Sequence, residues 1–266
     1  MTGRTGPFLT LAKDGKPVFQ PQRGGYPHNI WDRDGLSGAG YFGYAFGVIR
    51  DELKPGLLWY YNRFFKEADT RAAAPNDTVS VYPQVSVLSF VNWPIGLEEK
   101  NPTGVWPHAY RDSKWLFYAW RNRWQDENDV VISILTRGSK GFMGASGETT
   151  LSILTGGKVQ RWGGIQRGFA GEFTPAPDGS TILTTGDGSS LAIDFSGASG
   201  CDALLAMSGP TAPAENTVEV GGRKVAFLFV GKGPAPTPQV QGDKIVIGKQ
   251  TLGFQGEKLT LGAPQR

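Results

Sequence analysis

The strongest constraint on the fold is a change of hydrophobic period near residue 114. From there on, short apolar runs alternate at a period of two, and Gly, Asp and Ser turns separate most of them. The 38 glycines and 18 prolines of the chain suit many turns. Short strands spaced about 8–12 residues apart are typical of an antiparallel sandwich. The expected strands are residues 114–121, 129–136, 149–155, 171–174, 180–185, 189–195, 203–207, 224–230, 244–247, 251–254 and 258–261.

The first third of the chain has a helical period instead. Residues 41–53 are apolar around much of a helix, and residues 56–68 repeat apolar side chains at three-to-four spacing, so a broad face must be buried. Pro55 falls at the start of the second helix. Residues 82–93 fit either a strand or a third helix, and we favour the helix. The sequence therefore predicts an α+β chain. Its parts are a helical segment (1–93), a linker (94–113) and a mostly antiparallel β-sandwich (114–266).

Two aromatic helices of about a dozen residues need partners on both sides. Either they pack on the sandwich alone, or they are the end of a helical domain whose earlier helices are absent. We favour the second interpretation.

The stretch from 108 to 129 joins the two parts and is dense in aromatic and basic residues. Arg121 and Arg123 alternate across a strand end and should share one face. If this face borders a cleft, the two guanidinium groups form a clamp for an acidic sugar. The alternative is ion pairing with Asp126, Glu127 or Asp129, and the sequence leaves both open.

Residues 26–34 contain most of the closely spaced polar, charged and aromatic side chains in the first third of the chain. Tyr26, His28 and Asn29 are the candidate catalytic residues, because Asn or His can neutralise a substrate carboxylate and Tyr or His can move protons. The alternative is a capping cluster before the first helix. Trp31 could stack on a sugar, and Arg33 could bind the carboxylate of that sugar. The alternative, which we favour, is that the Asp–Arg–Asp group forms a structural ion-pair network.

His108 and Tyr110 precede the first predicted sandwich strand and are further candidates for substrate binding. For His108 we favour a hydrogen-bonded structural role. Cys201 is the single cysteine, so no intramolecular disulfide forms, and it has no neighbouring His in sequence to activate it.

Other classes of function find little support. The formal charge of +3 is spread along the chain, which leaves no basic footprint for nucleic acid. No apolar run approaches the roughly 20 residues of a membrane span. Residues 1–13 lack the pattern of a signal peptide. We expect no cofactor and no metal. Residues 126–129 bring oxygen ligands together as a solvated turn, with a structural Ca²⁺ or other divalent cation as the weaker alternative.

Four runs of residues carry a resemblance to a known family. They are HNIWDRDGLSGAGYFGYAFGVI, KPGLLWYYNRFF, FVNWPIGLEEKNP and FYAWRNRWQDENDVVISIL. Across roughly residues 28–165 the chain resembles bacterial heparinase II/III-like proteins, most specifically in the phrase Trp120-Arg121-Asn122-Arg123-Trp124-Gln125-Asp126. The resemblance implies the end of an incomplete (α/α) toroid followed by an antiparallel sandwich.

The resemblance also implies cleavage of uronic-acid polysaccharides by β-elimination, in a periplasmic or secreted setting. Such lyases carry a His-x-His-x-Asp-type segment in the early sandwich strands, whereas this chain has FMGASGETT at residues 142–150, without histidine. The expected partner is thus an acidic polysaccharide or oligosaccharide, and a homo-oligomer is an open alternative. The competing hypotheses are a non-catalytic carbohydrate-binding module, an inactive fragment of a lyase, and a structural protein whose aromatic residues are all core.

Overall fold

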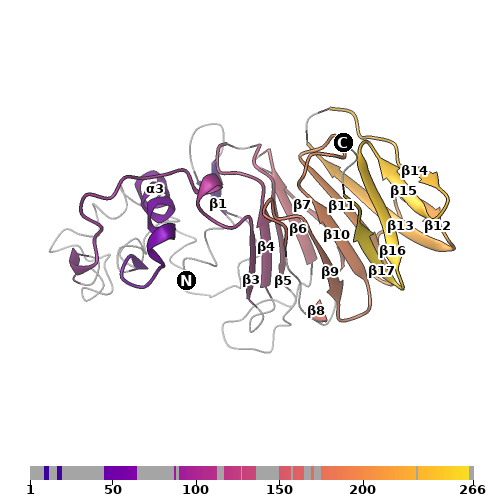
Figure 1. Ribbon diagram of the computed structural model, residues 1–266, viewed down its shortest axis with the longest axis horizontal. Coiled ribbons are helices and arrows are strands. Elements are labelled where there is room, and N and C mark those ends of the chain that lie inside the picture. Colours follow the sequence, from indigo (N-terminus) through magenta and orange to yellow (C-terminus); the bar gives the residue numbers. More distant parts are fainter. Residues whose placement is uncertain are drawn as a thin grey trace.

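A computed structural model describes residues 9–11, 17–19, 45–64, 87, 90–112, 117–126, 128–135, 150–156, 158–164, 169–170, 175–231 and 233–263. Helix α3 lies at one end of the long axis, followed by three sheets in succession (Figure 1). Every strand pair among the described residues is antiparallel. The prediction of a mostly antiparallel β structure is confirmed.

The first large sheet has five strands in the order β3-β4-β5-β6-β7. They span Ala109–Asp112, Phe117–Arg121, Val131–Leu135, Thr150–Thr155 and Lys158–Gly164. Strand β3 lies inside the predicted linker, and β7 was not predicted. Both are edge strands of this sheet, and neither has the clean apolar alternation on which the sequence prediction relied.

The second sheet has six strands in the order β12-β13-β11-β10-β9-β8. In chain order they span Phe169–Ala170 (β8), Thr181–Thr185 (β9), Ser190–Asp194 (β10), Ala203–Ser208 (β11), Thr217–Val220 (β12) and Arg223–Val230 (β13). Strands β8 and β12, both at the edges, are additions to the prediction. The expected strand at residues 171–174 lies outside the described residues.

The third sheet is a meander of four strands, β14-β15-β16-β17, over Gln239–Gln241, Lys244–Ile247, Gln250–Gln255 and Lys258–Leu261. Its three turns are two-residue loops that begin with Gly242, Gly248 and Gly256, each at positive φ. A glycine of positive φ in the first loop position is the requirement of a type II′ hairpin turn, so these glycines fix the register.

The six-stranded sheet is the middle layer, because it has a core on each face. Leu191, Ile193 and Leu205 pack with Trp120 and other residues of the five-stranded sheet. The alternate positions of β10 and β11, including Ala192, Leu204 and Ala206, pack against Ile245, Ile247, Leu252 and Leu259 of the four-stranded sheet. Strands that are buried on both faces become almost continuously apolar, as in the run ALLAMS of β11.

The helical part differs from the prediction. The expected helix 41–53 is interrupted, since Arg50 is extended and caps a short 3-10 helix, η2 (Asp51–Leu53), which leads directly into α3 (Lys54–Phe64). Lys54 and Pro55 therefore lie within helical structure and do not separate two helices. Of the expected helix 82–93, residues 87, 90 and 91 are helical. A second 3-10 helix, η3 (Pro102–Gly104), follows. Strands β1 (Leu9–Leu11) and β2 (Pro17–Phe19) pair with each other ahead of the expected helices.

No helix of the described residues is long and apolar enough to cross a membrane. The division into domains at residues 93 and 113 stays a prediction.

Candidate functional site

The turn between β4 and β5 is organised by Asp129, which is 1% exposed. Its carboxylate accepts hydrogen bonds from Arg121 Nη2 at 2.8 Å and from Arg123 Nε at 3.2 Å. The backbone N–H groups of Gln125 and Asp126 also donate to it, at 2.9 and 3.2 Å. Four donors around one buried carboxylate hold this turn in a fixed geometry, although Gln125 and Asp126 are themselves exposed.

Arg121 therefore takes the ion-pairing alternative that the sequence left open. Its side chain is 5% exposed, and its guanidinium lies 3.7 Å from the centre of the Trp124 ring. Burial lowers the pKa of Arg121, while the charge and hydrogen bonds of Asp129 oppose that effect. The predicted role of Arg121 as a clamp for sugar is corrected, because the guanidinium is directed into the protein.

Trp124 connects the β4–β5 turn to helix α3 through contacts between aromatic rings. Its ring meets Tyr60 and Trp106 edge-on, with centroids 5.4 Å away in each case, and Trp59 at 6.4 Å. These four residues form the aromatic cluster that packs α3 against the β4–β5 turn. Burial raises the pKa of Tyr60 well above its ordinary value, and the nearby charge of Arg121 opposes the rise. The aromatic residues here form a core, not an open stacking platform.

His108 is tied to the same strand end. Its Nδ1 lies 2.8 Å from the carbonyl oxygen of Arg121, whose N–H in turn donates to the carbonyl of His108 at 2.9 Å. Because the partner is a carbonyl, Nδ1 must carry the proton, and in the neutral ring Nε2 keeps its lone pair. This is the hydrogen-bonded structural role expected for His108.

Two other residues predicted to bind substrate are partly exposed to solvent. Arg123 donates to Asp129 through Nε, yet its side chain is 31% exposed. Tyr110 lies on β3 and is 38% exposed. The remaining candidates, Tyr26, His28, Asn29, Trp31 and Arg33, lie outside the described residues. The structure thus places four of the predicted residues around one strand end and leaves the catalytic hypothesis for Tyr26, His28 and Asn29 as a prediction.

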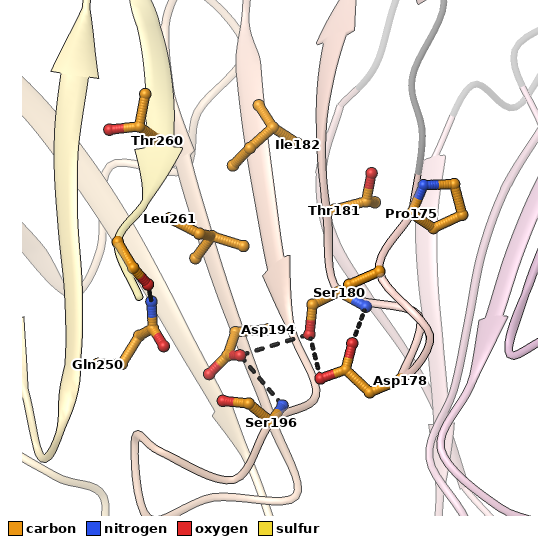
Figure 2. Close-up of a pocket in the computed structure, with 12 residues that line it drawn as sticks. Pro175, Asp178, Ser180, Thr181, Ile182, Asp194, Ser196, Gln250, Thr260 and Leu261 are labelled. Carbon is orange, nitrogen blue, oxygen red and sulfur yellow. Dashed lines mark hydrogen bonds between the residues drawn. The ribbon is translucent and has the colours of Figure 1, made fainter. Parts of the chain in front are cut away.

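A separate groove of about 710 Å³ opens between the middle sheet and the four-stranded sheet. Its lining comes from the turn before β9, the end of β10, and adjoining ends of β16 and β17 (Figure 2). Ser180 Oγ donates toward Asp178 Oδ2 at 3.0 Å and lies 3.4 Å from Asp194 Oδ1, while the N–H of Phe195 donates to Ser180 Oγ at 2.7 Å. Asp194 Oδ1 also accepts from the N–H of Ser196 at 3.1 Å.

One buried polar atom at this groove, Asp194 Oδ2, has no hydrogen-bond partner among the described residues, and Asp194 is 3% exposed. Gln250 is also buried at 1% exposure, and its amide nitrogen donates to the carbonyls of Thr251 and Gly262 at 3.1 and 3.0 Å. Unsatisfied buried polar atoms are uncommon in native proteins, and a bound water, ion or ligand is one explanation for them.

The sequence analysis treated the Gly, Asp and Ser segments between strands as turns, and it missed this groove. One signal was available: a β9–β10 hairpin that pairs Ser190 with Thr184 and Ile193 with Thr181 puts Asp194 opposite Ser180. Gln250 comes from another sheet, and no local pattern brings it there.

A second hollow of about 470 Å³ at the other end of β10 combines Asp187 and Glu257 with Arg223 and Lys224. Arg223 pairs with Glu257 at 2.8 Å on the surface. Burial alone would raise the pKa of Asp187, but hydrogen bonds from Thr185 and Ser189 outweigh it and lower the pKa. Arg223 and Glu257 neutralise one another here, whereas Asp187 Oδ2 has no hydrogen-bond partner among the described residues.

No group of three or more His, Cys, Asp or Glu side chains suited to a metal ion occurs within the part of the chain that the structure describes. In the comparisons with known proteins, no family model, curated protein or solved structure matches the chain.

Proposed function

We propose that this chain forms the end of the helical toroid and the sandwich of a heparinase II/III-like polysaccharide lyase that acts on an acidic, uronic-acid glycan. The observation that supports this most is the joint at the β4–β5 turn. The phrase from Trp120 to Asp126, which carries the resemblance, ties α3 to the first long strands through Asp129 and Trp124. A toroid-to-sandwich junction needs such a rigid connection.

In this proposal the catalytic groups are Tyr26, His28 and Asn29. β-Elimination breaks the C5–H bond and the C4–O bond of the uronate and forms a C4=C5 double bond. Asn29 or His28 would neutralise the uronate carboxylate, a base would take the C5 proton, and Tyr26 or His28 would return a proton to the leaving oxygen. Trp31, Arg33, Tyr110 and Arg123 would contact the substrate. Arg121 and His108 would position this strand end.

The test is eliminative cleavage of a panel of heparin, heparan, chondroitin, alginate and ulvan. Unsaturated uronate products absorb in the near ultraviolet, and the proposal requires them from at least one glycan. Removing a general acid or base should lower kcat by about 10²–10⁴-fold, so His28→Ala and Tyr26→Phe should lose this much. Glu257→Gln is the matched control, since Glu257 is exposed on the four-stranded sheet. Absence of product across the panel would refute a lyase.

The competing function is a carbohydrate-binding or scaffold module without catalysis, including an inactive fragment of such a lyase. One observation favours it: His108 and Arg121, both predicted to bind substrate, are used in hydrogen bonds within the protein. Binding of an acidic glycan without turnover, unchanged by His28→Ala, would establish this reading. Sedimentation of the active species would tell whether a second copy completes the cleft.

A further inference from the structure

We infer that the groove between the middle sheet and the four-stranded sheet is a binding site for a sugar residue without carboxylate or sulfate groups. Asp194 would accept hydrogen bonds from the hydroxyl or amino groups of that sugar. This inference does not rest on the lyase proposal, because it uses neither the β4–β5 turn nor the residues from Tyr26 to Arg33.

The first argument is the unpartnered carboxylate oxygen. Figure 2 shows one oxygen of Asp194 joined to Ser180 and Ser196, whereas the other turns to the side on which Gln250 lies. A buried carboxylate oxygen without a donor is costly, and a ligand that brings an O–H or N–H removes this cost.

The second argument is that Asp194 is held before any ligand arrives. Its Oδ1 accepts from the N–H of Ser196, and the neighbouring Ser180 hydroxyl is fixed by Phe195 and Asp178. The oxygen that remains therefore has a set direction. A binding group whose rotamer is locked by its neighbours loses little conformational entropy on binding.

The third argument is the sign of the charge. The described lining includes the carboxylates of Asp178 and Asp194 and no Lys or Arg. An anionic sugar would meet two like charges without a compensating cation. Hydroxyl or ammonium donors suit the site, and the apolar side chains of Pro175, Ile182 and Leu261 can cover the C–H face of a pyranose. The groove volume of about 710 Å³ lies within the range of small-ligand sites.

The test uses the full chain with isotope-labelled isoleucine methyl groups and NMR titration. Ile182 lines the groove, and Ile134, buried in the core between the five-stranded and middle sheets, is the internal reference. The probes are the methyl glycosides of glucose and galactose, then glucosamine and galactosamine, then glucuronate and galacturonate. These pyranoses share a frame and differ in charge, so they separate hydroxyl from ammonium recognition.

We expect saturable shifts of Ile182 with a neutral or amino sugar and none with the uronates. Asp194→Asn keeps an acceptor for the Ser196 N–H and removes the charge, and it should weaken binding by about tenfold or more. Asp187→Asn, at the opposite end of β10, is the matched control and should leave the affinity unchanged. Leu261→Ala removes an apolar side chain from the groove lining, and should weaken binding even if Asp194→Asn fails to fold.

Three results would overturn the inference. The first is the absence of saturable shifts with all six sugars. The second is binding of the uronates as tightly as the neutral sugars. The third is an affinity that neither Asp194→Asn nor Leu261→Ala alters.

Discussion

Substituting Asp129 by Ala tests the structural role of the β4–β5 turn. The change leaves Arg121, which is 5% exposed, as a buried charge without its ion-pair partner. Breaking a buried pair in this way costs about 3–5 kcal/mol. The lost acceptors for Gln125 and Asp126 add little, because both residues are exposed and water can replace them. We therefore expect the free energy of unfolding to fall by about 3–5 kcal/mol, a large part of the roughly 5–15 kcal/mol of a whole domain.

Urea unfolding followed by tryptophan fluorescence and far-ultraviolet circular dichroism measures this loss. Trp124 lies within the joint and contributes to the fluorescence signal of the chain's eight tryptophans. Glu257→Ala is the control, because it breaks an ion pair with Arg223 at the surface and should hardly move the midpoint. The double variant Arg121→Met with Asp129→Leu removes both charges, and should be less destabilised than the sum of its single changes.

The reasoning is refuted if Asp129→Ala shifts the unfolding midpoint no more than Glu257→Ala does. It also fails if the double variant is simply additive, since coupling between Arg121 and Asp129 is what the geometry requires.

Three further predictions concern residues in described parts of the fold. Burial raises the pKa of Tyr60, against the effect of Arg121, so the unfolded chain loses this proton at a lower pH than the folded chain does. The free energy of unfolding should therefore fall above about pH 10. Urea unfolding measured at several pH values should show a smaller fall for Tyr60→Phe. Gly56→Ala should lower the unfolding free energy by about 1–3 kcal/mol despite the better helix propensity of Ala, because the new Cβ would lie 2.6 Å from the Trp106 indole nitrogen. Burial also raises the pKa of the Cys201 thiol, so it should react with a disulfide reagent at neutral pH more slowly than glutathione; an equal rate would contradict this.

The β part of the fold could be predicted because its strands carry local signals. The runs over β10, β11 and β15 alternate or are apolar throughout, and turn glycines bound several of them. Edge strands such as β3 and β12 were missed because hydrogen bonds to one neighbour, and not burial, define them. Which strands share a sheet depends on contacts between distant parts of the chain, so the three layers had no signature in sequence.

The candidate sites also differ in how far local sequence patterns could predict them. The pairing of Arg121 with Asp129 spans eight residues, and the acidic turn after the arginines already offered it as an alternative. The groove needs the hairpin register that sets Ser180 opposite Asp194 and a further sheet that brings Gln250. A local pattern can suggest the first requirement but not the second.

The middle sheet has a consequence for synthesis of the chain on the ribosome. Strands β14 to β17 follow the middle sheet in sequence, yet they cover one of its faces. Until they emerge, Leu204, Val225 and Phe227 belong to a sheet that is folded on one side and bare on the other. The interval before β14 to β17 emerge is thus when this sheet is most exposed to aggregation, and when a chaperone that binds apolar strands would matter most.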